Sequence, residues 1–232
     1  MKQLLLICAV VMGQSVLAAD KKPLTKEESA KVIEAAIRKY GENTPVIHLW
    51  DKQLTDLKGV EELTGLTRLW LQNNHLTDVK IIKKFKNLTH LSVQGNRLTS
   101  VKALENLAKL EYLYLDRNRI NDVDDLGKLT KLKHLTLDEN QLTSVKGLET
   151  LTELTDLGLR NNRLTSVKGL EMLAKLKSLN LYNNQLTDVK GLENLTRLNE
   201  LILQNNPDLT KVQIAELKKA LPKCKIFSNP KK

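Results

Sequence analysis

Residues 162–198 read NRLTSVKGLEMLAKLKSLNLYNNQLTDVKGLENLTRL, and one pattern occurs in them twice, 22 residues apart. Its core is L-x-L-x-x-N-x-L, as in residues 135–142 and 179–186. The asparagine of this pattern recurs at 22-residue steps, at Asn74, Asn96, Asn118, Asn140, Asn162, Asn184 and Asn206. Self-similarity at a fixed period of this length predicts an architecture of stacked repeats.

Each repeat has two parts with different expected roles. The L-x-L segment predicts a short strand, and the following V-K-G-L-E-x-L segment returns the chain to the start of the next strand. A single repeat cannot bury its leucines, but stacked repeats share one continuous core. An earlier copy at residues 47–54 has Lys52 in place of the asparagine, which gives eight repeats over residues 46–209. The asparagine side chain both donates and accepts hydrogen bonds, so we expect it to satisfy backbone groups rather than a ligand.

The repeat unit resembles the 22-residue leucine-rich repeat of the bacterial internalins, and the match covers about 70% of the chain. This resemblance implies an α/β repeat solenoid, a right-handed superhelix with a parallel concave β-sheet and helical caps at both ends. The resemblance implies adhesion modules, because internalins bind host proteins through aromatic residues on the concave face. Aromatic residues occupy such concave positions here as Trp70, Tyr112, Tyr114 and Tyr182. The chain departs from them after the repeats, where no LPxTG-like wall anchor or long all-β region follows. We therefore expect a free secreted or periplasmic binder rather than a host adhesin.

The first twenty residues, MKQLLLICAVVMGQSVLAAD, predict a signal peptide over residues 1–19. Lys2 precedes an apolar run, and small residues follow it, so cleavage is expected after Ala18 or Ala19. The run is shorter than the roughly 20 apolar residues of a membrane span, and Cys8 lacks a lipobox. Cleavage would leave Cys224 alone, without an internal disulfide. The alternative interpretation is an N-terminal core helix.

Both ends of the repeat array have sequences typical of capping helices. Residues 20–45 predict an N-terminal cap in which Thr25 and Glu28 form a capping box and Gly41 ends the helix. Its apolar face is expected to comprise Val32, Ile33, Ala36, Ile37 and Tyr40. Residues 210–232 predict a C-terminal cap whose helix starts at Thr210 and stops at Pro222, before a last strand within residues 223–227. Its apolar side is expected to comprise Val212, Ile214, Leu217 and Leu221. Membrane binding by the N-terminal helix is the alternative.

The strands also predict what faces outward, because side chains alternate between the two faces of a strand. If Leu69 and Leu71 face the core, Trp70 between them faces the opposite surface of the sheet. The same rule applied to all eight repeats gives three outward columns. The first is Val46, Arg68, His90, Tyr112, His134, Asp156, Ser178 and Glu200; the second is His48, Trp70, Ser92, Tyr114, Thr136, Gly158, Asn180 and Ile202; the third is Trp50, Gln72, Gln94, Asp116, Asp138, Arg160, Tyr182 and Gln204.

These columns concentrate the scarce ring-bearing residues of the chain. They hold both tryptophans, three of the four tyrosines and three of the four histidines, mostly in repeats one to five. An aromatic surface of this kind is typical of a binding site, although aromatic neighbours also stabilise a sheet by packing on one another. The candidate ligand-binding residues are His48, Trp50, Trp70, Gln72, His90, Tyr112, Tyr114, Asp116, His134 and Asp138.

The same surface offers no convincing catalytic or metal-binding constellation, and we expect no cofactor. His90 and His134 are two strands apart, roughly 10 Å from strand spacing, which is too far to share one zinc ion. Asp116 and Asp138 are neighbours that could mimic a glycosidase pair or hold a cation. Nothing in the pattern encloses a sugar ring, however, so a basic or amine-bearing ligand over these acids is the better interpretation.

The formal charge of +10 does not by itself indicate nucleic acid. Lysines of the return segments are followed by glutamates three residues later, a mixture typical of a solubilising face. Arg97, Arg119 and Arg163 recur after the strands, but acidic residues share that surface and the export signal argues against nucleic acid. The sequence therefore predicts an exported, non-enzymatic protein–protein interaction module that binds on the concave face of repeats one to five. Glycan or envelope-polymer binding by the same patch, or a purely structural spacer, are the alternatives.

Overall fold

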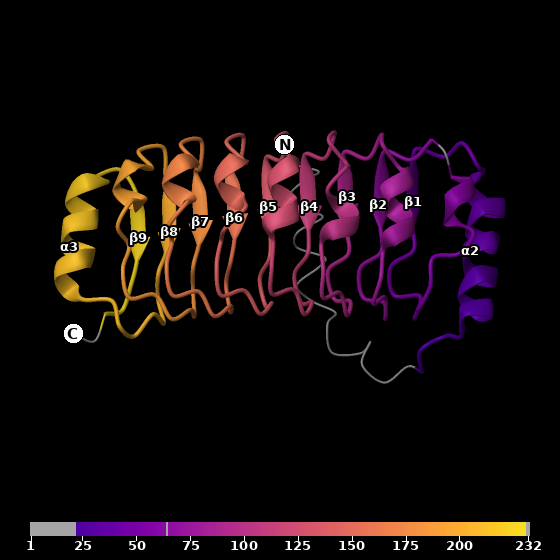
Figure 1. The fold of residues 1–232 in the computed structure, drawn as a ribbon, viewed down its shortest axis with the longest axis horizontal. Helices are drawn as coiled ribbons and strands as arrows, with labels where there is room; N and C mark the ends of the chain where they lie inside the picture. The colour runs from indigo at the N-terminus through magenta and orange to yellow at the C-terminus, as the bar shows by residue number, and fades with distance from the viewer. Residues whose placement is uncertain (1–21, 64, 231–232) are drawn as a thin grey trace.

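A single parallel sheet of nine short strands runs the length of the molecule in the computed structural model, which describes residues 22–63 and 65–230 (Figure 1). The strands follow one another in chain order: β1 (Val46–His48), β2 (Arg68–Trp70), β3 (His90–Ser92), β4 (Tyr112–Tyr114), β5 (His134–Thr136), β6 (Asp156–Gly158), β7 (Ser178–Asn180), β8 (Glu200–Ile202) and β9 (Lys225–Phe227). The predicted last strand is thus confirmed as β9, which pairs with β8. The predicted signal peptide, residues 1–19, lies outside the described residues.

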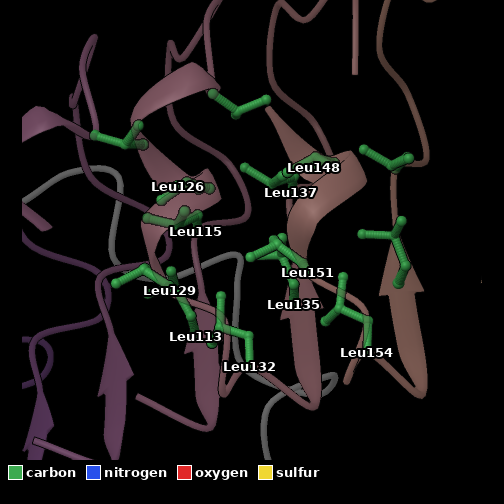
Figure 2. Close-up of a cluster of buried hydrophobic side chains, with 14 of the residues drawn as sticks. Leu113, Leu115, Leu126, Leu129, Leu132, Leu135, Leu137, Leu148, Leu151 and Leu154 are labelled. Atoms are coloured by element: carbon green, nitrogen blue, oxygen red, sulfur yellow. The ribbon is translucent and has the colours of Figure 1, made fainter. Parts of the chain in front are cut away.

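The core lies between the strands and the return segments, most of which form one turn of 3₁₀ helix. These turns are η1 (Val60–Glu62), η2 (Lys80–Lys84), η3 (Lys102–Leu104), η4 (Asp124–Lys128), η5 (Leu148–Thr150), η6 (Leu170–Met172) and η7 (Leu192–Asn194). Figure 2 shows leucines of neighbouring repeats in equivalent places, with Leu113 and Leu115 facing Leu126 and Leu129. All four are fully buried, and each contributes roughly 1.5–3 kcal/mol by leaving water. The predicted leucine-rich repeat solenoid is confirmed.

The asparagines form a hydrogen-bonded ladder that connects each repeat to the one before it. Asn140 Nδ2 donates to the backbone oxygens of Leu115 (3.0 Å) and Leu137 (3.1 Å), and its Oδ1 accepts from the Ile120 N–H at 3.0 Å. The other six asparagines repeat this arrangement and are 2–8% exposed. Because each asparagine bonds backward, the first repeat needs none, which explains why Lys52 is tolerated there.

The glutamates of the return segments have a structural role beyond solubility. The glycine two residues earlier adopts a left-handed conformation at four of these positions, with φ between 92° and 105° at Gly59, Gly147, Gly169 and Gly191. In each case its N–H donates to the glutamate carboxylate, at 2.8 Å for Glu61 and 2.6 Å for Glu149, Glu171 and Glu193. The V-K-G-L-E motif therefore encodes a self-capped turn, made possible by a residue without a side chain.

Two α-helices close the ends of the row of strands, as Figure 1 shows. Helix α2 (Lys26–Tyr40) starts with the predicted Thr25–Glu28 capping box and ends at Gly41. Helix α3 (Lys211–Ala220) starts with a capping box between Thr210 and Gln213 and ends before Pro222, since the residue preceding a proline disfavours helix. None of the helices among the described residues is long and apolar enough to cross a membrane.

Two residues assigned to the apolar faces of these helices do not pack there. Val212 is 66% exposed, because α3 buries Ile214 and Leu217 and a residue two positions from Ile214 points to the opposite side. Tyr40 is 41% exposed at the last position of α2, and the Lys39 ammonium lies 5.0 Å from the centre of its ring.

Candidate binding surface

The strand register places the outward side chains in the columns predicted from the sequence. Arg68, His90, Tyr112 and His134 are aligned across β2 to β5. Trp70 is aligned with Ser92, and Ser92 with Tyr114. Because the pairing holds without a slip from β1 to β8, residues 22 positions apart lie side by side on the open face of the sheet.

Six rings on this face form one connected cluster, which we call the ring cluster: His48, Trp70, His90, Tyr112, Tyr114 and His134. His90 and Tyr112 stack with centroids 4.4 Å apart, and Tyr112 continues to His134 at 6.3 Å. Tyr114 contacts His134 at 5.2 Å and Trp70 at 6.3 Å, and Trp70 stacks on His48 at 6.3 Å. Trp70 reaches Tyr114 across the small Ser92, so the cluster extends from β1 to β5.

These contacts change the expected exposure of the surface. Trp70 faces away from the core as predicted, but it is half-buried, as are four of the other five rings, because the rings cover one another. Trp50 is the more open tryptophan, 44% exposed. Burial also lowers the pKa of His48 and His90, and the neighbouring Arg68 lowers the pKa of His90 further. Both imidazoles are therefore neutral at physiological pH.

Beside the ring cluster, Asp116 and Asp138 form a closely coupled acid pair. Asp116 accepts hydrogen bonds from the Thr136 hydroxyl at 2.6 Å and from the Asp138 N–H at 2.9 Å. Asp138 Oδ1 accepts from the Arg160 N–H at 2.8 Å. Burial raises the pKa of Asp116 despite these bonds, and burial together with the Asp116 charge raises the pKa of Asp138 to about 6.

Arg160 and Glu139 complete this charged group, and sequence reasoning left both out of the candidate site. Arg160 Nη2 lies 2.6 Å from Glu139 Oε1, whereas its Nε is 3.5 Å from Asp138 Oδ2. That Nε is buried and has no hydrogen-bond partner among the described residues. Arg160 is thus held by Glu139 and compensates the negative charge of Asp138 only in part.

The backbone φ angles also distinguish the repeats that contain Asp116 and Asp138. The residue directly before the ladder asparagine, or before Lys52 in the first repeat, has positive φ in every repeat, and six of the eight copies hold Asp, Asn or Gly, which tolerate that conformation: Asp51, Asn73, Gly95, Asn161, Asn183 and Asn205. The two exceptions are Arg117 (φ 52°) and Glu139 (φ 56°), directly after Asp116 and Asp138. Larger side chains in this conformation are strained, so this departure from the repeat could have pointed to the charged group.

The aromatic and charged side chains are presented on one face of an open sheet. No group of three or more His, Cys, Asp or Glu among the described residues could hold a metal ion. The charged and aromatic side chains lie along an open sheet rather than in an enclosed site. A hollow between η7 and α3, lined by residues such as Lys190, Glu193 and Gln213, is formed by elements other than the strands of this face.

Comparison with known families agrees with the repeat geometry. A model described as leucine-rich repeats in two copies matches residues 86–128 and 130–172, and a single leucine-rich repeat model matches residues 175–195. The chain is a leucine-rich repeat protein. Repeats of this class form solenoids with extended binding surfaces, so this leucine-rich repeat chain has the fold of a protein–protein interaction module. No curated protein matches its sequence.

Solved leucine-rich repeat structures share the fold. An internalin from Listeria monocytogenes is 24% identical with a TM-score of 0.70, over 89% of this chain and 71% of the internalin. A leucine-rich repeat protein from Leptospira interrogans is 29% identical with a TM-score of 0.62, over 75% of this chain and 52% of its own. The ectodomain of the Arabidopsis thaliana receptor kinase GASSHO1/SCHENGEN3, solved in complex with CASPARIAN STRIP INTEGRITY FACTOR 2, is 24% identical with a TM-score of 0.67, over 81% of this chain and 24% of the ectodomain chain.

Proposed function

We propose that this leucine-rich repeat protein is an exported, non-enzymatic module that binds another protein through the sheet face of repeats one to five. The observation that carries the proposal is the ring cluster, which joins six aromatic and histidine side chains across five strands. Tyrosine and tryptophan are enriched at the centres of protein interfaces, where they supply most of the binding energy.

Contacts between the rings favour binding as well as folding. Neighbouring rings on a sheet stabilise it by packing on one another. The same packing holds the side chains in place before a partner binds. Binding therefore avoids part of the cost of ordering mobile side chains, which is about 0.5–1.5 kcal/mol for each side chain that becomes immobilised. A surface that is both rigid and aromatic is therefore suited to a tight interface.

Export is the second part of the proposal and rests on residues 1–19. The charged start, the apolar run and the small residues Ala18 and Ala19 have the order of a signal peptide. We expect a secreted or periplasmic protein whose mature chain begins at Ala19 or Asp20. Amino-terminal sequencing of the protein recovered from its producing cells tests this; an intact Met1 on the mature protein would contradict it.

The ring cluster is tested by replacing Trp70, Tyr112 and Tyr114 together with alanine. Wild-type protein and this triple variant serve as baits for envelope and secreted extracts, and captured proteins are compared by quantitative mass spectrometry. The matched control is Met172→Ala with Val212→Ala, which removes apolar side chains that are 57% and 66% exposed outside the sheet. A partner enriched by wild type and control but lost with the triple variant is then purified, and its affinity is measured by calorimetry.

Other outcomes favour the remaining functions. Enrichment that disappears after enzymatic removal of glycans, with Trp50 exposed for stacking on sugars, would assign the surface to glycan or envelope polymer. Equal capture by wild type and triple variant would refute recognition through the ring cluster. A structural spacer would then be the better explanation.

A further inference from the structure

The side chains of the second outward column become small beside the acid pair. After Tyr114 on β4, the next two positions are Thr136 on β5 and Gly158 on β6. A Cβ atom added at Gly158 would lie 2.8 Å from Asp138 Oδ1, so the absence of a side chain there leaves room for the carboxylate. Tyr114 and His134 border this low part of the surface with ring centroids 5.2 Å apart and planes tilted by 47°.

The charged group beside it carries an excess of negative charge. It contains three carboxylates, Asp116, Asp138 and Glu139, and one guanidinium group, Arg160; with Arg117, whose charge also acts on Asp116, the formal charge is −1. Asp116 uses both carboxylate oxygens in hydrogen bonds to Thr136 and Asp138. Asp138 Oδ2, in contrast, lies 3.5 Å from Arg160 Nε without forming a hydrogen bond with it, and the Asp138 side chain is 23% exposed. This oxygen is therefore the one that a partner can approach.

We propose that the sheet face of β4 to β6 receives an arginine side chain of the partner, packed on Tyr114 and His134 with its guanidinium group on Asp138. An arginine fits both features, because its planar group stacks on aromatic rings and donates to carboxylates in a fixed geometry. An incoming cation also offsets the mutual repulsion of Asp116 and Asp138, which Arg160, turned toward Glu139, offsets only in part. This inference rests on the proposed function and specifies the chemistry of its partner.

A library of random linear peptides displayed on phage provides the probe, with the purified protein as target. We expect selected peptides to share an arginine. Its replacement by norleucine in the synthetic peptide should weaken binding about tenfold, which corresponds to about 1.4 kcal/mol, and lysine should give a smaller loss. Asp138→Asn should weaken binding of the arginine peptide by about the same factor, while Glu200→Gln on β8, which removes one carboxylate elsewhere on this face, should leave it unchanged.

The two changes are combined in a double-mutant cycle, which isolates the contact from any effect on folding. If arginine binds Asp138, the norleucine peptide should bind wild type and Asp138→Asn equally. Peptides that require Trp70, Tyr112 and Tyr114 but share no arginine, or an arginine that does not couple to Asp138, would overturn this inference and leave the proposed function standing. Failure of the library to yield any peptide that prefers wild type over the triple variant would overturn both.

Discussion

Asp138→Asn isolates the energetic cost of the acid pair. The amide keeps the size of the carboxylate and its oxygen can still accept the Arg160 N–H that now lies 2.8 Å from Oδ1. It removes the charge that burial and Asp116 disfavour, the two causes that raise the pKa of Asp138 from 3.8 to about 6. The folded wild type at neutral pH therefore carries a carboxylate that is better solvated in the unfolded chain.

The sign and size of the effect follow from proton linkage. Between pH 3.8 and about 6 the folded chain binds the proton of Asp138 more tightly than the unfolded chain, so this residue makes the free energy of unfolding increase as the pH falls. The difference of about 2 pKa units corresponds to about 3 kcal/mol, and screening at the 23% exposed side chain reduces it to about 2 kcal/mol. Asp138→Asn should be more stable than wild type by about this amount near pH 7.5, and the difference should disappear as the pH falls below 3.8.

Urea unfolding of both proteins, followed by circular dichroism at several pH values between these limits, measures the difference. Comparing variant with wild type cancels the opposite contribution of His48 and His90, whose lowered pKa values make the folded state less stable as the pH falls. Asp156→Asn is the matched control of opposite sign, since His134 lowers the pKa of Asp156, and it should be less stable than wild type at neutral pH. A difference between Asp138→Asn and wild type that is the same at every pH would refute the reasoning.

Three further substitutions test the fold. Leu137→Ala removes a fully buried leucine and should lower the free energy of unfolding by roughly 2–5 kcal/mol in urea titrations; a loss under about 1 kcal/mol would contradict its core position. Asn140→Ala removes three hydrogen bonds to buried backbone groups and should cost about 2–4 kcal/mol, with faster hydrogen exchange at Ile120; unchanged exchange would argue against the ladder. Arg117→Asn relieves a side chain at positive φ and should raise the melting temperature by a few degrees, corresponding to about 1 kcal/mol; a lower value would show that the Arg117 side chain stabilises the fold.

The sequence was sufficient to predict the strands, their register and the outward columns, because a fixed 22-residue period leaves one way to stack the repeats. It also predicted both capping helices from local signals at Thr25 and Thr210. It did not predict that Val212 points to solvent, since the rotation of α3 is set by how Ile214 and Leu217 pack on the last repeat. Local periodicity contains no information about that contact.

For the candidate site, the columns placed Asp116 and Asp138 side by side but not their charge state. That state depends on side-chain conformation: Asp116 turns toward Thr136, and Arg160 turns toward Glu139 and away from full contact with Asp138. The half-burial of Trp70 likewise depends on Ser92 being small enough for the indole to reach Tyr114. Such choices are made by neighbours in space, which a single sequence identifies only after the fold is known.

The backward direction of the asparagine ladder has a consequence for how such a chain can change in length. Each asparagine bonds its repeat to the one before it. After the last repeat, the side chain of Asn229 in the C-terminal tail accepts a hydrogen bond from the Asn205 N–H at 2.7 Å. Duplication or loss of one 22-residue unit inside the array therefore leaves every rung intact and breaks no cap. The ring cluster and the acid pair could be moved apart, or a second copy of either acquired, by recombination between repeats alone.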